Sequence, residues 1–568
     1  MPGEAKKMAA GSMKICRLFF RGGCDIKKKK GGRDMFDILI KNGTVVDGSG
    51  APGYRADVAV KDGKVARIAP NIDGEARETL DATGLIVSPG FIDCHTHSDS
   101  FVFRGSDAYN YLEQGVTTQI AGNCGSSPAP LSPQQMAAIH KNYSPMEAIF
   151  RVVSSSSPAA FMRMAEKASL GTNMAFFIGH NPIRSKFVGE CDVKPTAEQL
   201  SAMQDMVVQA MEAGYLGYSS GLVYTPSVYA DTDELIALAK VMAPYGGIYA
   251  SHIRGEGDFV ERAVEEAIAV GQAAGVAVHI SHLKVMGLHN TGKADALLKQ
   301  IDEANRNGVT VTADQYPYTA SSASLASQIP PKYGDGGKEA QLQHLQDSAT
   351  REKILHDIFC CPEDFESGIY HAGFDGVLIT NLPKTKEYVN RTLGEIAKTE
   401  GKEPIDVLCD ILVANDNGGS AVYFNQSPSD LIRILEHPRV FCGSDNSDMT
   451  GARKEPETLG GRHPRAMGTM VRRLELVRDF RLSGLEEAVR RITSAPAQAM
   501  HLAGQGLLKE GWDANITVFS YEDLHAKASY EKPFRENEGI VHVLVNGTVA
   551  LRHGKFTGNR AGKVLKRG

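Results

Sequence analysis

Two histidines placed two residues apart carry the first chemical signal in this sequence. The apolar run Leu85-Ile86-Val87 leads through Ser88-Pro89-Gly90 into a short predicted strand, Phe91–Cys94, which continues to His95 and His97. Side chains on a strand alternate with a period of two, so both imidazoles point to the same side. Two neutral imidazoles that converge on one point supply half of a metal site.

Four further metal-capable side chains follow later predicted strands. They are Cys124, His252, His282 and Asp445. Taken singly, such a histidine is most often a satisfied core residue, and a buried cysteine usually packs as a small hydrophobe. Together with the His-x-His pair they form a set of four imidazoles, one thiol and one carboxylate. Zinc accepts nitrogen, sulfur and oxygen donors, so the pattern predicts a zinc-type site.

Three neighbouring features qualify this set. His279 lies three residues before His282, so strand alternation places it on the opposite face, and we expect it to face the surrounding helices. Cys94 alternates with the two histidines that follow it, and we expect it to pack in the core. Gly122 and Gly125 flank the candidate thiol ligand and allow the backbone to turn and approach closely there.

Strand and helix signals alternate through the middle of the chain. The predicted strands are Phe91–Cys94, Thr118–Ala121, Met174–Ile178, Leu216–Ser219, Ile248–Ser251, Val276–Ser281, Val309–Ala313 and Val440–Gly443. Amphipathic periodicity marks Ala197–Ala213, Thr232–Met242, Phe259–Ala274 and Lys293–Asn307. Eight strands alternating with helices predict an α/β fold of the (β/α)₈ TIM-like type, whose functional side chains gather at the C-terminal strand ends.

Both ends of the chain have the sequence pattern of short strands joined by tight turns. Two-residue turns at Asn42-Gly43, Asp62-Gly63 and Asn546-Gly547 predict three hairpins, within Asp37–Asp47, Ala56–Ile68 and Val541–Leu551. Ala514–Phe519 is a further predicted strand. Because the two ends are similar in kind, we expect them to pair into one small β-sandwich.

These signals predict four parts of the chain. The connection after the seventh strand is too long for one helix, so we expect an inserted subdomain over the barrel mouth. Residues 1–34, which contain four consecutive lysines, read as a disordered basic leader. The expected ranges are the leader at 1–34, the sandwich at 35–89 and 508–568, the barrel at 90–319 and 381–507, and the insert at 320–380.

The composition of the chain limits the classes of function that are possible. The chain has 568 residues, of which 42% are hydrophobic and 23% charged, as in an ordinary globular protein. A formal net charge of -5 gives no electrostatic case for a nucleic-acid partner, and no apolar run approaches the length of a membrane span. Nine cysteines without a C-x-x-C pair favour free thiols in a reducing compartment, the cytoplasm. Nothing predicts an oligomeric state.

Several motifs resemble one enzyme family. The segment Phe91–His97, together with the paired ends, is similar to the amidohydrolase superfamily. Within it, the following segments resemble the N-acyl-D-amino-acid deacylases (D-aminoacylases): Gly122–Gly125, Gly221–Tyr224, Ile280–Lys284, Asp314–Tyr318 and His463–Arg465. Relatives of the hydantoinase and dihydroorotase type bridge two metals with a carboxylated lysine on strand four. Here that strand reads Gly217–Gly221, with no lysine, and Cys124 matches the bridging cysteine of the D-aminoacylases.

The resemblance implies a role for each matching residue. A tight zinc site falls on Cys124, His252 and His282, and a second, weaker metal position falls on His95, His97, Cys124 and Asp445. Asp445 is the implied catalytic residue. Groups that hold the substrate α-carboxylate fall on Lys284, Tyr316, Ser322 and Arg465, and Tyr224 matches a tyrosine near the scissile bond. Residues 446–462 form a longer connection than typical members have, which bears on the assignment of Arg465.

The implied activity is zinc-dependent hydrolysis of a linear small-molecule substrate, an N-acyl-D-amino acid. Two alternatives stay open from the residues alone. One is a cyclic amidase of the hydantoinase or dihydroorotase type, or a ring deaminase, neither of which needs a clamp for a free carboxylate. The other is an inactive metal-binding scaffold, although a scaffold has no need of Asp445.

Overall fold

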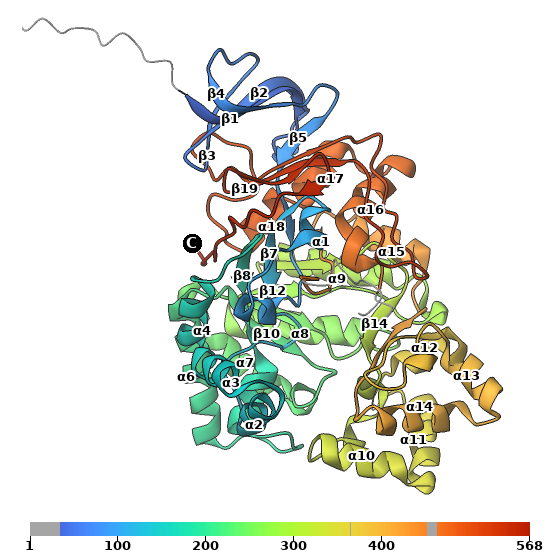
Figure 1. Cartoon of the computed structure of the whole chain (residues 1–568). Helices are drawn as coiled ribbons and strands as arrows, with labels where there is room; N and C mark the ends of the chain where they lie inside the picture. Colours follow the sequence, from blue (N-terminus) through green and yellow to red (C-terminus); the bar gives the residue numbers. More distant parts are fainter. Residues whose placement is uncertain (1–34, 364, 451–462) are drawn as a thin grey trace, which may run out of the picture.

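The structure is a computed structural model that describes residues 35–363, 365–450 and 463–568 (Figure 1). The expected leader, residues 1–34, and residues 451–462 of the long connection lie outside the described residues. Within the described part, the chain has a mixed α/β fold, and no helix there is long and apolar enough to cross a membrane.

All eight predicted central strands are present and pair in parallel. One sheet contains β6 (Phe91–Asp93), β7 (Val116–Ala121) and β8 (Asn173–Phe176). The other, in sequence order, contains β9 (Ile178–Gly179), β10 (Gly217–Gly221), β11 (Ile248–His252), β12 (Ala277–Ile280), β13 (Val311–Gln315) and β17 (Val440–Cys442). The third predicted strand is thus divided at Phe177 into β8 and β9.

Backbone hydrogen bonds connect the last of these strands with the first. The N–H of Cys94, just after β6, donates to the carbonyl of Cys442 in β17 at 3.4 Å. Farther along, the N–H of His97 donates to the carbonyl of Asn446 at 2.8 Å. The segments that carry the first and last candidate ligands therefore lie side by side.

Helices pack against the outward side chains of these strands. The four predicted helices are α6 (Ala197–Ala213), α7 (Thr232–Lys240), α8 (Val260–Ala274) and α9 (Ala294–Arg306). The others around the parallel strands are α1 (Tyr109–Leu112), α2 (Pro133–Asn142), α3 (Pro145–Ser154), α4 (Pro158–Ala165), α5 (His180–Phe187), α15 (Pro428–Leu435), α16 (Arg465–Asp479), α17 (Leu485–Arg491) and α18 (Ser494–Ala499). Thr196 and Gln199 form a capping box at the start of α6, which satisfies N–H groups that lack a partner within the helix.

The two ends of the chain form one sheet of nine strands. The N-terminal strands are β1 (Phe36–Val45), β2 (Tyr54–Lys61), β3 (Lys64–Ala69), β4 (Ala76–Asp81) and β5 (Ile86–Pro89). The C-terminal strands are β18 (Ile516–Phe519), β19 (Ile540–Val545), β20 (Thr548–Arg552) and β21 (Lys555–Phe556). β5 pairs antiparallel with β18, so the predicted pairing of the two ends is confirmed. Figure 1 shows the blue N-terminal strands beside the red C-terminal ones.

One of the three predicted hairpins is wrong. Asn42-Gly43 does not reverse the chain, because Phe36–Val45 is a single strand, β1, that pairs with β2 on both sides of this point. The register shifts between Ile40 and Gly43, so Asn42, with φ 64°, forms a bulge in place of a turn. The Asp62-Gly63 and Asn546-Gly547 hairpins are confirmed.

The insert is a separate small α/β unit, seen at the lower right of Figure 1. Its antiparallel sheet has β16 (Ser420–Tyr423) between β14 (Ser321–Ser324) and β15 (Val377–Asn381). Its helices are α10 (Lys338–Gln346), α11 (Ser348–Cys360), α12 (Gly368–Ala372), α13 (Leu393–Glu400) and α14 (Pro404–Ala414). One hydrophobic cluster extends from Leu325 to Tyr423, so residues after 380 pack with the insert.

Ile516 tests whether the shared sheet supports the fold. It is fully buried in a cluster that combines residues from both chain ends. We expect Ile516→Ala to lower the free energy of unfolding by about 2–5 kcal/mol, because truncation leaves a cavity. Urea unfolding followed by circular dichroism measures this. Ile149→Ala, at a side chain that is 54% exposed, is the control and should change stability by less than about 0.5 kcal/mol. Equal losses in both variants would contradict a shared core.

Candidate metal centre

The six predicted ligands meet at the C-terminal ends of five parallel strands. His95 and His97 follow β6, Cys124 follows β7, His252 ends β11, His282 follows β12 and Asp445 follows β17. They form two overlapping clusters, one of His95, His97, Cys124 and Asp445 and one of Cys124, His252 and His282. Within each cluster, the candidate ligand atoms all lie within 4.8 Å of one another.

The thiol of Cys124 is the atom that both clusters share. Its Sγ lies 3.2 Å from Nε2 of His95 and 3.3 Å from Nε2 of His282. The rings of His252 and His282 are 4.4 Å apart between centroids and nearly perpendicular. Nitrogen and sulfur ligands of one tetrahedral zinc ion lie about 3.5–3.6 Å apart, given Zn–N of about 2.0–2.1 Å and Zn–S of about 2.3 Å. The separations of 3.2 and 3.3 Å are a few tenths of an ångström shorter, so small shifts of these side chains would admit an ion.

Asp445 completes the second cluster from the opposite side. Its Oδ1 lies 3.0 Å from Nε2 of His97 and 3.6 Å from Nε2 of His95. The prediction that the two histidines after β6 project to the same side is confirmed, because both rings reach this carboxylate.

Three of the six residues adopt a left-handed backbone conformation. Cys124 has φ 51°, His282 has φ 35° and Asp445 has φ 47°. Such a conformation in a residue other than glycine costs on the order of 1–3 kcal/mol and persists where the surroundings impose it. Gly122, with φ 82°, precedes Cys124, and a Cβ there would lie 2.0 Å from the carbonyl oxygen of Phe177. Glycine at 122 is therefore required for the turn that presents the thiol.

Two observations indicate that these residues fit a zinc ion. The Nδ1 atom of His252 is buried and has no hydrogen-bond partner among the described residues, as expected of a ligand nitrogen. Burial alone raises the pKa of the Cys124 thiol, but the neighbouring His95 and His282 bring it well below its ordinary value. A thiolate, two imidazoles and an open position are a recurrent zinc ligand set.

Two buried carboxylates without a role predicted from the sequence hold two of the candidate ligand rings. Oε1 of Glu256 lies 3.0 Å from Nδ1 of His282, and Oδ2 of Asp314 lies 3.3 Å from Nδ1 of His95. A carboxylate behind a metal-binding histidine fixes its tautomer and orientation. Both carboxylates could have been predicted from their positions in the sequence, since Asp314 directly follows a predicted strand and Glu256 lies four residues after His252.

The expected orientation of His279 is wrong. Val278 and Ile280 pack with the helices, whereas Nε2 of His279 lies 2.9 Å from Oδ2 of Asp314, on the inner side of the strands. The sequence argument assumed unbroken alternation up to His282. However, β12 ends at Ile280, and the positive φ of His282 turns its side chain back to the inner side. Cys94 packs with Phe441, as predicted.

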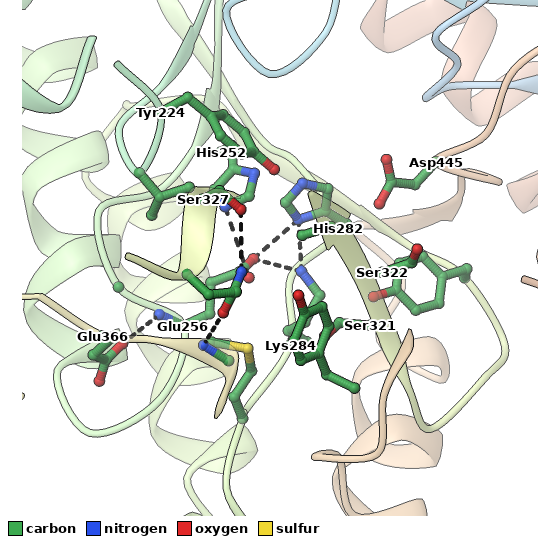
Figure 2. Close-up of a pocket in the computed structure, with 18 of the residues that line it drawn as sticks. Tyr224, His252, Glu256, His282, Lys284, Ser321, Ser322, Ser327, Glu366 and Asp445 are labelled. Carbon is green, nitrogen blue, oxygen red and sulfur yellow. Dashed lines mark hydrogen bonds and ion pairs between the residues drawn. The ribbon is translucent and has the colours of Figure 1, made fainter. Parts of the chain in front are cut away.

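A pocket beside the two clusters contains the predicted substrate-binding residues (Figure 2). All five of these residues line it: Tyr224, Lys284, Tyr316, Ser322 and Arg465. Four of the predicted metal ligands line it as well, namely His97, His252, His282 and Asp445. The ring of Tyr224 lies 5.1 Å from that of His252. Ser321, next to Ser322 in the chain, also lines this pocket, whereas the nearby Ser324 does not. His95 and Cys124 do not line the pocket themselves, but they contact Asp445 and His282, which do.

The two cations of the pocket differ in how they are paired. Nζ of Lys284 donates to Oε1 of Glu256 and lies 2.7 Å from Nδ1 of His282, so this ammonium shares the carboxylate that holds a candidate ligand ring. Arg465, the first residue of α16, lies with Nη1 2.8 Å from Oδ2 of Asp445 and stacks over Tyr316 at 4.7 Å. Its buried Nε has no hydrogen-bond partner among the described residues, so one edge of the guanidinium is free to bind an anion.

Cys124 provides a test of the metal centre. We expect Cys124→Ala to reduce the zinc content per chain, measured by elemental analysis after gel filtration, because the shared ligand is lost. Cys442→Ala is the matched control, since Cys442 is buried in a hydrophobic cluster and belongs to neither ligand cluster. Unchanged zinc in Cys124→Ala, in a protein with normal circular dichroism, would contradict the assignment.

Comparison with known proteins places this geometry in a family. The amidohydrolase family model matches residues 78–286 and 388–551. The chain is 33% identical over 539 residues to a D-aminoacylase of Alcaligenes xylosoxydans xylosoxydans, which covers 94% of this chain and 98% of the relative. It is also 33% identical to an N-acyl-D-glutamate deacylase of the same organism, over 94% of this chain and 97% of the relative.

A solved structure agrees with these relatives. N-acyl-D-glutamate deacylase from Bordetella bronchiseptica, in complex with zinc and a phosphonate that mimics the tetrahedral intermediate, superposes with a TM-score of 0.77 at 32% identity. The match covers 94% of this chain and 100% of that one. The chain therefore belongs to the amidohydrolase family, among the D-aminoacylases and related N-acyl-D-amino-acid deacylases.

Proposed function

We propose that this protein hydrolyses the amide bond of N-acyl-D-amino acids and releases a carboxylate and a free D-amino acid. The observation that carries the proposal is the arrangement around one pocket: a thiol–imidazole cluster at its base, the carboxylate of Asp445, and the guanidinium of Arg465, whose Nε has no hydrogen-bond partner among the described residues. The first group suits a metal, the second a proton transfer and the third a substrate carboxylate. The relatives with this activity span nearly the whole chain.

The proposed cofactor is zinc. Cys124, His252 and His282 would hold one ion tightly, and His95, His97, Cys124 and Asp445 would hold a second ion more weakly. Zinc bound there would polarise the acyl carbonyl and lower the pKa of a bound water to roughly 7.

Asp445 would move the proton. Burial raises its pKa, but the guanidinium of Arg465 and the ring of His282 bring the pKa well below its ordinary value. The carboxylate is therefore ionised at neutral pH and able to accept a proton from the attacking water. Delivery of that proton to the leaving nitrogen would complete a general base and general acid cycle.

The remaining pocket residues would orient the substrate. Arg465 would bind the α-carboxylate through its unpaired edge, because a guanidinium can bond both carboxylate oxygens. Tyr316 supports that guanidinium from below, and Ser322 lines the pocket from the insert. Burial raises the pKa of Tyr224 well above its ordinary value, so its hydroxyl stays protonated and can donate to the developing oxyanion. Lys284 shares its charge with Glu256 and contributes less to the clamp.

The proposal includes the domain organisation. The parallel strands would close into a (β/α)₈ barrel at residues 90–319 and from about 428 to 507, supported by the hydrogen bonds between the ends of β6 and β17. The insert would extend from 320 to about 427, beyond its expected end at 380, because its core includes Tyr423. Residues 35–89 and 508–568 would form the β-sandwich.

The residues of β10 do not favour a cyclic amidase of the hydantoinase type. β10, the strand from which such enzymes would supply a carboxylated lysine, carries only glycine, tyrosine and serine.

Replacement of Asp445 tests the proton-transfer role. We expect Asp445→Asn to lower kcat by about 10²–10⁴-fold, because a general base is lost, while the zinc of the tight cluster is retained. Amine release and zinc content are measured in the same sample. Asp73→Asn, at an exposed position, should match the wild type. A rate in Asp445→Asn equal to that of the wild type would exclude this role.

The choice of enantiomer tests the substrate class. We expect N-acetyl-D-methionine to be hydrolysed with a kcat/KM on the order of 10²-fold above that of N-acetyl-L-methionine. With carboxylate and carbonyl both fixed, inversion exchanges hydrogen and side chain against the pocket wall. Assays with a hydantoin and with cytosine serve as controls, and faster turnover of either ring would replace the proposal by a cyclic amidase or deaminase.

A further inference from the structure

A second group of metal-capable side chains lies outside the ligand clusters described above. Asp258 follows β11, His289 follows β12 and His371 lies in α12 of the insert. One ligand atom of each lies within 4.8 Å of the others. Nε2 of His289 is 2.7 Å from Oδ1 of Asp258, and the rings of His289 and His371 stack with centroids 5.6 Å apart.

Among these three residues, His371 gives the indication that a cation binds here. It is 9% exposed, and neither ring nitrogen has a hydrogen-bond partner among the described residues. Oε1 of Glu366 lies 3.9 Å from its Nε2, which is too long for a hydrogen bond. A buried polar atom without a partner costs about 1–3 kcal/mol. A cation coordinated by the ring would remove this cost.

The backbone around His371 makes room for its ring. A Cβ on Gly257, in the loop after β11, would lie 2.2 Å from Nε2 of His371. The imidazole of the insert thus sits directly against the same loop that carries Asp258. Any side chain at position 257 would separate these two groups.

Further contacts orient the carboxylate of Asp258. The hydroxyl of Tyr370 donates to its Oδ2 at 3.0 Å, and the side-chain amide of Asn290 donates to its Oδ1 at 2.6 Å. Lys293 donates to the backbone carbonyl of Asp258 and leaves the carboxylate to the other groups. Outer contacts of this kind are typical of carboxylates that bind metals.

We propose that Asp258, His289 and His371 bind a divalent first-row transition cation of the zinc class. Two imidazoles and one carboxylate suit such an ion, and the side chain of His289 is 53% exposed, so the site is open to solvent for entry and for a water ligand.

The ion would join the insert to the rim of the active-site pocket. Glu366 lies five residues before His371 and lines that pocket. Its carboxylate accepts hydrogen bonds from the backbone N–H groups of Glu256, Gly257 and Phe259, at 2.8, 3.0 and 3.0 Å. Glu256 in turn holds His282. One cation would therefore fix a segment of the insert against the loop that supports the catalytic zinc site.

Cobalt is the probe that separates the two sites. The full chain, carrying its active-site metal, is dialysed against Co²⁺ or Zn²⁺, and metal per chain is counted for wild type, His289→Ala, Asp258→Asn and the control His140→Ala. His140 is an exposed histidine outside every candidate cluster in the described residues. We expect one cation fewer in His289→Ala and Asp258→Asn than in the other two. Cobalt at this site should add ligand-field absorption without a thiolate charge-transfer band, since no cysteine contributes.

A stability measurement tests whether this cation connects the insert to the loop after β11. Added Zn²⁺ should raise the thermal unfolding midpoint of the wild type and of His140→Ala by more than that of His289→Ala, in which only the weaker position of the active-site clusters remains to be filled. Because His289 is half exposed, its replacement does not threaten folding. The proposal would be overturned if all four proteins contained the same amount of metal, because His289→Ala and Asp258→Asn would then have retained every cation that the wild type binds.

Discussion

The structure depends on the charge balance around one sulfur atom. A buried thiolate at Cys124 is stable only with positive charge beside it, and three imidazoles and a bound cation can supply it. Residues 95, 124 and 282 come from three different strands, so this balance exists only when those strands lie in register. The left-handed backbone of Cys124, His282 and Asp445 is the conformational cost of bringing ligands into one small volume.

A second layer of carboxylates gives the site its rigidity. Glu256 holds His282 and Lys284, and Asp314 holds His95 and His279. The rings of His95, His279 and His282 are thereby held in orientation by the protein itself, which reduces the entropy lost when a ligand binds. Nζ of Lys284 donates to Glu256, so this ammonium contacts the carboxylate layer as well as lining the pocket.

The insert takes part in both binding regions. Ser322 and Glu366 contribute to the pocket wall, while His371 reaches the loops after β11 and β12 from the outside. The loop between Gly255 and Phe259 therefore has the active-site pocket on one side and the second histidine cluster on the other. Glu366 of the insert accepts a hydrogen bond from the backbone of Glu256, and the carboxylate of Glu256 contacts His282, so this loop connects the insert with one of the candidate ligands.

Local patterns in the sequence determined much of this protein. The eight central strands, the four amphipathic helices, the pairing of the two ends and all eleven candidate site residues follow from periodicity, strand-end position and family motifs. Each of those eleven lies in the pocket or directly beneath it. Such features are encoded within a few residues, because side-chain alternation and turn preference are local properties.

Tertiary structure decided what depends on distant partners. Whether Asn42-Gly43 turns or bulges was set by the pairing of β1 with β2, and the direction of His279 was set by where β12 ends. The extent of the insert follows from hydrophobic contacts between segments up to about 100 residues apart. The roles of Glu256, Asp314 and His371 depend on contacts with residues that are distant in the sequence. The sequence by itself determined which chemical groups are present and which strand ends carry them, and only the packing decided which of those groups touch.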